Sequence, residues 1–192
     1  MSKLIISLVG YGGSGKTTIA KHLHNKYGFY TFTFSNVIRD YAKKYAVQLN
    51  KRADFAKVHS RIIDDFGVEF LPSLALKTDD DLVCIDNLSS LVYADYLRKR
   101  GGQEIAFVCP TEVRFSRTHS SGDSAKYPST IEAFIQNEQE DEKVIIGHGV
   151  RIETPKVIKT ADYHVDTDYP LVDVIREVDN IIDLVLKNKS AL

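Results

Sequence analysis

A run of eight residues near the N-terminus has the types and the spacing that a phosphate-binding loop requires. The pattern G-x-x-x-x-G-K-[ST] is matched in full by Gly10, Tyr11, Gly12, Gly13, Ser14, Gly15, Lys16 and Thr17. Glycines allow the backbone to curl so that its N–H groups point inward, and the helix that follows adds the donors of its N-terminus. A glycine-rich turn that serves packing alone is the alternative, which the complete match disfavours.

The side chains at the end of this run suit a triphosphate with Mg²⁺. Lys16 would place a compact positive charge on the β- and γ-phosphates, and the Thr17 hydroxyl would ligate the metal that bridges them. Thr18 would help to hold the α-phosphate. Asp86 ends an otherwise apolar strand, at the sheet edge where ligands of open α/β sheets collect, and could orient magnesium through water. The alternative for Asp86 is that it only caps the next turn.

Apolar patterning places the loop between a strand and a helix and predicts an alternating α/β chain. Runs rich in β-branched or aromatic residues predict strands at 4–9, 29–34, 82–86, 105–108 and 163–165. Helical spacing predicts helices at 17–27, 36–46, 52–66, 69–76, 89–100, 111–118, 129–141 and 171–186. Right-handed crossovers put helices on both faces of a mostly parallel sheet. We therefore expect a three-layer α/β/α sandwich with a five-stranded parallel sheet.

Turn and cap signals predict where some of these elements begin and end. Gly28 is expected to end the first helix in the left-handed conformation, and Ser35 is expected to cap the second. Residues 119–127, rich in serine and glycine, are expected to form a loop. Residues 144–159 are expected to be irregular, because two glycines and a proline interrupt any pattern there.

Length and charge exclude several classes of protein. The 192 residues suffice for one domain with a buried core, and 25 basic against 26 acidic residues provide no global field toward nucleic acid or anionic lipid. The first apolar run is too short for a membrane span or a signal peptide, so we expect a cytoplasmic protein. Cys84 and Cys109 each end an apolar run and are expected to be buried free thiols.

Five segments of the chain carry a family resemblance. They are Gly10 to Thr18, Phe34-Ser35-Asn36-Val37-Ile38-Arg39, Val83-Cys84-Ile85-Asp86, Pro110 to Arg117, and Ala161-Asp162-Tyr163. Together they resemble the nucleoside monophosphate kinase superfamily, and within it the adenylate-kinase-like and dephospho-coenzyme-A-kinase-like branch. The resemblance implies a P-loop fold with strand order 2-3-1-4-5 in a single domain, 1–192. It also implies a helical acceptor-binding region at 36–78 and a lid region at 111–142.

The resemblance also implies roles for three arginines. Arg39 matches the arginine that holds the acceptor phosphate, a contact that suits a planar guanidinium. Pairing of Arg39 with a surface acid is the alternative. Arg114 and Arg117 match lid arginines that neutralise charge as the transition state forms, and their spacing of three puts them on one helix face. One of these two could instead be an ordinary residue of the helix surface.

The chain departs from the family pattern at two places. Family members usually carry an arginine shortly after the aspartate of the third strand, whereas here Asp86 is followed by Asn-Leu-Ser-Ser. The segment Gln136-Asn137-Glu138 stands where relatives often have a basic residue. Arg151 could compensate, or it could be an ordinary loop charge. These departures weaken the identification of the acceptor and leave the triphosphate site intact.

The prediction from sequence is an ATP-dependent phosphotransferase that uses Mg²⁺ and a nucleotide or similarly small acceptor. Its catalytic residues would be Lys16, Arg39, Arg114 and Arg117. Two alternatives stay open: a P-loop switch that hydrolyses ATP without a small-molecule acceptor, and a dephospho-coenzyme-A-kinase-type activity on a ribose hydroxyl. The expected partners are small molecules rather than nucleic acid or membrane, and the expected state is a monomer or a homodimer.

Overall fold

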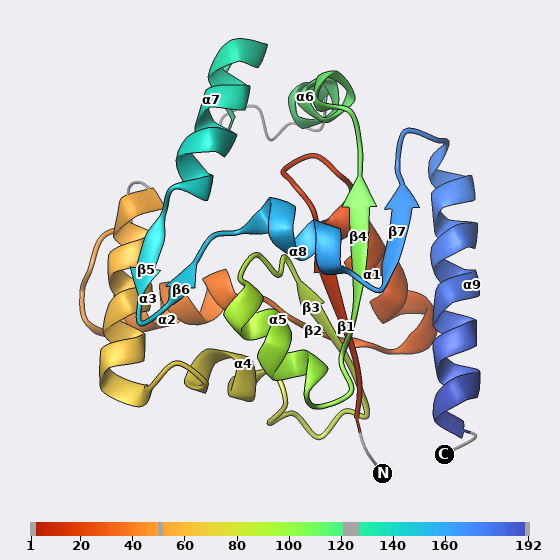
Figure 1. The fold of residues 1–192 in the computed structure, drawn as a ribbon, viewed down its shortest axis with the longest axis horizontal. Coiled ribbons are helices and arrows are strands. Elements are labelled where there is room, and N and C mark those ends of the chain that lie inside the picture. Colours follow the sequence, from red (N-terminus) through yellow and green to blue (C-terminus); the bar gives the residue numbers. More distant parts are fainter. Residues whose placement is uncertain (1–2, 50–51, 121–126, 191–192) are drawn as a thin grey trace.

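A five-stranded sheet forms the centre of the computed structural model, which describes residues 3–49, 52–120 and 127–190 (Figure 1). The strands are β1 (Leu4–Val9), β2 (Tyr30–Phe32), β3 (Leu82–Asp86), β4 (Gln103–Val108) and β7 (Tyr163–Asp166). Their order is β2-β3-β1-β4-β7, and every neighbouring pair is parallel. Counted along the chain, this is the order 2-3-1-4-5, so the predicted sheet is confirmed.

Helices cover both faces of the sheet because successive residues of a strand point to opposite sides. On one face, Leu4, Ile6 and Leu8 of β1 pack with α1 (Lys16–Tyr27) and α9 (Leu171–Ser190). On the other face, Ile5 and Val9 belong to the larger core. That core includes side chains of α2 (Phe34–Lys44), α3 (Arg52–Phe66), α4 (Phe70–Leu74), α5 (Leu91–Arg98) and α8 (Thr154–Thr160). The predicted three-layer sandwich is therefore confirmed.

The first two helices test the predicted caps. Gly28 has φ 77° and donates its N–H to the carbonyl of His24, so it ends α1 as expected. Helix α2 begins two residues earlier than predicted, because Thr33 is the last extended residue, with φ −132° and ψ 119°. The expectation that Ser35 caps this helix is wrong. Ser35 lies inside its first turn, and its hydroxyl accepts a hydrogen bond from Arg39 instead.

Two helices lie beyond the end of the sheet to which β4 points (Figure 1). They are α6 (Thr111–Ser120) and α7 (Ile131–Glu142). Helix α6 continues two residues past its predicted end, and most of the loop expected at 119–127 falls on 121–126, outside the described residues. Helix α7 is capped by Thr130, whose hydroxyl accepts a hydrogen bond from the N–H of Ala133 at 3.3 Å.

The segment 144–159, expected to be irregular, forms regular elements. It contains an antiparallel hairpin, β5 (Ile145–Gly147) and β6 (Val150–Arg151), followed by α8. The glycines that interrupt the pattern build the hairpin turn, since Gly147 and Gly149 have φ 134° and 81°. Pro155 lies in the first turn of α8, where its missing N–H is tolerated. The expectation was wrong because these strands are too short to show a period.

Two further expectations concern the burial of the cysteines and the length of the apolar segments. Cys84 is a buried free thiol as predicted, but Cys109 is only half-buried because it follows β4 at the edge of the sheet. Over the ranges that the structure describes, no helix combines the length and the apolar character needed to cross a membrane.

A buried polar contact joins α3 to α5. His59 Nε2 lies 2.5 Å from the hydroxyl of Tyr93, and the Tyr93 ring stacks on Phe34 with the ring centroids 5.2 Å apart. His59 is 7% exposed, and this burial lowers its pKa to about 4. The folded protein therefore keeps this imidazole neutral at a pH at which an unfolded chain would protonate it.

We expect this histidine to make the fold sensitive to acid. Because the pKa of His59 is lower in the folded state, stability is fully present above pH 6.5 and falls as the pH drops toward 4. The free energy of unfolding should be about 2 kcal/mol lower at pH 5 than at pH 7.5 from this residue alone. Denaturant titrations at the two pH values should show that His59→Gln loses this part of the pH dependence of the unfolding free energy. His164→Gln, which removes an exposed imidazole, is the control and should retain it.

Candidate active site

One cleft of about 1750 Å³ opens at the carboxyl ends of the strands. Its walls come from the glycine-rich loop, α2, α3, α6, α7, the hairpin, and the segments that follow β3 and β7. Of the residues predicted for the site, it is lined by Gly10, Gly12, Gly13, Ser14, Gly15, Lys16, Thr17, Thr18, Arg39, Asp86 and Arg117. The fold thus brings the residues predicted to bind the triphosphate together with Arg39, which was predicted to bind the acceptor, although they lie far apart in the sequence. Arg114 does not lie on this wall.

Close backbone packing gives the glycine-rich loop its shape. Gly13 has φ 77°, and a Cβ placed on it would lie 2.6 Å from the carbonyl oxygen of Arg114. Only glycine accepts both the left-handed conformation and this contact. The first turns of α6 therefore lie directly against the loop and fix its outer side.

Lys16 is held inside the loop. Its ammonium donates hydrogen bonds to the carbonyl of Tyr11 at 2.8 Å and to the hydroxyl of Ser14 at 3.4 Å. The residue is 8% exposed, and this burial lowers its pKa to about 8, although the nearby Asp86 carboxylate opposes the shift. A buried ammonium with two neutral acceptors is electrostatically incomplete, so an anion that enters the loop would be strongly favoured.

Thr17 and Asp86 meet at the edge between β1 and β3. Asp86 pairs with Leu8 in the register of these strands, and its Oδ2 accepts a hydrogen bond from the Thr17 hydroxyl at 3.2 Å. Burial raises the pKa of Asp86, while Lys16 and Thr17 lower it. Its Oδ1 is buried without a hydrogen-bond partner among the described residues. Such an orphaned carboxylate oxygen beside a hydroxyl fits the oxygen ligands that Mg²⁺ prefers.

Arg39 lines the cleft from α2. Its Nη1 donates to the Ser35 hydroxyl at 2.9 Å and to Asn36 Oδ1 at 3.0 Å, and the guanidinium lies 5.3 Å from the centre of the Phe55 ring. Within the described ranges no carboxylate forms an ion pair with Arg39. Lys57 of α3 lines the same side of the cleft. This wall therefore presents two cations.

Arg117 joins α6 to the segment that follows β7. Its Nη2 donates to the carbonyl of Thr167 at 2.6 Å, and its Nη1 lies 3.5 Å from the sulfur of Cys109. The side chain is half-buried on the cleft wall, near Tyr169, which is 60% exposed. The guanidinium of Arg117 is therefore held in place by these contacts, while the residue remains partly exposed on the cleft wall.

Arg114 is placed differently, although it lies only three residues away on the same helix. It is 3% exposed, and all five of its N–H groups are directed to protein acceptors. Those acceptors are the carbonyls of Cys109 and Gly12, the Thr111 hydroxyl and both oxygens of Glu138. In this conformation Arg114 therefore has no N–H left for a phosphate.

Several cleft residues carry no recognisable signal in the sequence. The Tyr11 hydroxyl donates a hydrogen bond to Glu142, and the Tyr127 ring lies close enough to Gly12 that an added Cβ would be 3.1 Å from it. Glu138 stands out in the sequence only as part of a segment in which the resemblance implies a basic residue. Arg151 is exposed on β6 and is absent from the cleft wall, so the structure does not support its compensating role.

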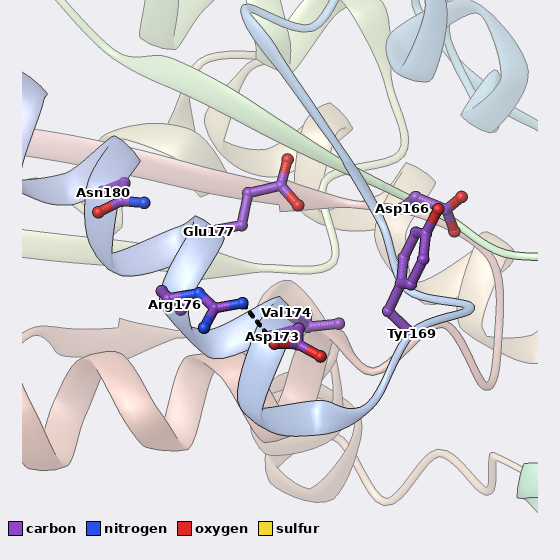
Figure 2. A pocket seen from close by; sticks show the side chains of 7 residues that line it. All are labelled: Asp166, Tyr169, Asp173, Val174, Arg176, Glu177 and Asn180. Atoms are coloured by element: carbon purple, nitrogen blue, oxygen red, sulfur yellow. Dashed lines mark hydrogen bonds and ion pairs between the residues drawn. The ribbon is translucent and has the colours of Figure 1, made fainter.

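A smaller pocket of about 210 Å³ lies beside the cleft, between the end of β7 and the start of α9 (Figure 2). Its lining residues are Asp166, Tyr169, Asp173, Val174, Arg176, Glu177 and Asn180. Arg176 and Asp173, three residues apart on α9, form an ion pair at 2.5 Å. None of the predicted site residues lines it.

The chain is similar to known proteins along its whole length. The family model described as "AAA domain" matches residues 6–146. A cytidylate kinase of Desulfurococcus amylolyticus is 24% identical over 190 residues, which cover 98% of this chain and 97% of that protein. Both matches span the glycine-rich loop, Arg39, Asp86, Arg114 and Arg117.

Solved structures with the same fold include several kinases. A shikimate kinase from Acinetobacter baumannii has a TM-score of 0.59 at 18% identity, covering 98% of this chain and 96% of its own. The APS kinase of Mycobacterium tuberculosis has a TM-score of 0.56 at 18% identity, with 97% and 98% covered. TT1252 from Thermus thermophilus has a TM-score of 0.63 at 16% identity, with 95% and 98% covered. At these identities the likeness shows the fold. The chain belongs to the AAA domain family and has the P-loop fold of the nucleoside-monophosphate-kinase-like superfamily.

Proposed function

We propose that this protein transfers the γ-phosphoryl group of Mg-ATP to a nucleotide or a similarly small phosphorylated acceptor. The observation that carries the proposal is a single cleft that is lined both by Lys16, Thr17 and Asp86 at the sheet edge and by Arg39 of α2. The kinases that share the fold, and the full-length similarity to a cytidylate kinase, support it. In the reaction, an acceptor oxygen attacks the γ-phosphorus, the bond from that phosphorus to the β,γ-bridging oxygen breaks, and ADP leaves.

The donor side would bind the triphosphate mainly through backbone N–H groups of the glycine-rich loop and the start of α1. The backbone donors would come from Gly10, Gly12, Gly13, Ser14, Gly15, Lys16, Thr17 and Thr18. The buried ammonium of Lys16, which donates only to a carbonyl and a hydroxyl, would gain an anionic hydrogen-bond acceptor. Magnesium, when held by Thr17 and Asp86, would neutralise charge on the β- and γ-phosphates. The loop thus supplies position and electrostatics rather than covalent chemistry.

The acceptor side favours a phosphorylated molecule. Arg39 and Lys57 give this wall two cations, and a guanidinium can hold a phosphate through two parallel hydrogen bonds. Arg117 would stabilise charge on the transferred group, because it lines the cleft and its guanidinium is held by the carbonyl of Thr167. Because the N–H groups of Arg114 are occupied, fewer cations are available for transfer than the resemblance implies. Because of this shortage, an ATP-hydrolysing switch is the second candidate function.

An ADP-release assay should distinguish the two. Supplied with Mg-ATP, the protein should form ADP rapidly only when its acceptor is present in a panel of ribonucleoside and deoxyribonucleoside monophosphates, nucleosides and dephospho-coenzyme A. Lys16→Ala should remove this activity and leave the fold intact, because the ammonium's hydrogen bonds go to Tyr11 and Ser14 of the same loop and not to the core. Slow release that no member of the panel accelerates would favour the switch.

Arg39 should act on the acceptor more than on the donor. We expect Arg39→Ala to raise the acceptor KM or lower kcat by about tenfold or more, because one charge-assisted phosphate contact is lost. The affinity for Mg-ATP should change less than about twofold. Lys43→Ala removes a cation from an exposed position of the same helix and is the control. A collapse of ATP affinity in Arg39→Ala would contradict this division of the cleft.

The lowered pKa of Lys16 predicts a pH dependence for nucleotide binding. In the free protein, with a pKa of about 8, half of the Lys16 ammonium groups have lost their proton at that pH, whereas bound phosphate would stabilise the charged form. The affinity for Mg-ADP should therefore be constant below pH 7 and about tenfold weaker at pH 9. Calorimetry across this range checks the expectation, and Lys16→Met should bind weakly with no such slope. An affinity that rises with pH would refute it.

A further inference from the structure

The position of the glycine-rich loop depends on one buried guanidinium. Arg114 donates from Nη1 to the carbonyl of Gly12 at 3.1 Å and from Nε to the carbonyl of Cys109 at 3.2 Å. Cys109 directly follows β4, so one side chain ties the loop to the end of a core strand. The backbone carbonyl of Arg114 also lies against Gly13. The loop therefore takes its position from α6 through both the backbone and the side chain of this residue.

Glu138 of α7 orients that guanidinium. Its two carboxylate oxygens accept from both terminal nitrogens of Arg114, and the two side chains are only 4% and 19% exposed. An arginine cannot lose its proton to relieve burial, so its charge requires this partner. The bidentate geometry also fixes the guanidinium plane, and the remaining N–H of Nη1 then points to Gly12.

A second contact joins α7 to the loop at the neighbouring residue. The Tyr11 hydroxyl donates to Glu142, which lies four residues after Glu138 on the same face of α7. Burial, together with this hydrogen bond, raises the pKa of Tyr11, so the phenol remains a neutral donor. Two adjacent loop residues are therefore held by two carboxylates one helical turn apart.

We propose that Glu138 is a positioning residue of the donor site: it holds Arg114 so that the guanidinium supports the Gly12 carbonyl and pre-organises the loop for phosphate. This inference rests on the proposed function, since it assigns the loop to a nucleotide. The competing possibility is that Arg114 leaves Glu138 and binds a phosphate itself. The buried position of Arg114 and its five occupied N–H groups favour positioning.

The two possibilities predict opposite results when Glu138 is changed. If Glu138 positions the loop, Glu138→Ala should weaken Mg-ADP binding by about tenfold, and Glu138→Gln, which keeps one acceptor, should weaken it less. If Glu138 only competes with phosphate for Arg114, both variants should bind more tightly. Calorimetry measures the affinity without any acceptor. Glu132→Gln removes an exposed charge from the first turn of α7 and should bind like the unmodified protein.

A double variant separates positioning from folding. Arg114→Leu combined with Glu138→Leu leaves no unpaired buried charge, so it should unfold at nearly the unmodified temperature. It should still bind Mg-ADP as weakly as Arg114→Leu alone, because both lose the same hydrogen bond to Gly12. Full affinity in the double variant, or unchanged or tighter binding in Glu138→Ala, would overturn the proposal. An unmodified protein that binds no Mg-ADP would instead overturn the proposed function, and this inference with it.

Discussion

The candidate site is arranged around one positive charge that is buried at the glycine-rich loop. The Lys16 ammonium lies inside the glycine-rich loop with only a carbonyl and a hydroxyl as acceptors, and burial lowers its pKa to about 8. Two neighbours hold the loop in this conformation: the fully buried strand β1 that precedes it, and helix α6, whose Arg114 backbone packs against Gly13. The ammonium has no anionic hydrogen-bond acceptor. The buried charge and the loop's position at the sheet edge therefore both favour a phosphate-containing ligand in the cleft.

The layers of the fold could be predicted because their signals are local. A buried strand, a glycine-rich turn and a helix with apolar residues on one side follow each other without interruption from Leu4 to Tyr27. The same reasoning failed where an element is too short to show a period, as in the hairpin 145–151. It also failed at Ser35, whose hydroxyl bonds to a side chain rather than to the backbone at the start of α2. Both failures depend on contacts that residue types alone do not specify.

A residue of the candidate site could be predicted where it belongs to the glycine-rich motif or comes at the end of a predicted strand. Lys16, Asp86 and Arg39 all line one cleft, as expected from parallel strands that end at a common edge. Arg114 and Arg117 show the limit of prediction from sequence. A spacing of three places Arg114 and Arg117 on one helix face, yet a rotation of about 60° between them is enough to bury the first and leave the second on the cleft. The partner that decides the matter, Glu138, lies 24 residues further along the chain.

The hairpin has one more consequence for the cleft. Helix α7 runs directly into β5, which lies beside α3 (Figure 1). At the far end of the hairpin, His148 contacts Asp64 of α3 at 2.6 Å. The chain from 138 to 148 therefore contacts the glycine-rich loop through α7 and contacts α3 through the hairpin. Two walls of the cleft are thus linked through one continuous segment as well as through the sheet beneath them.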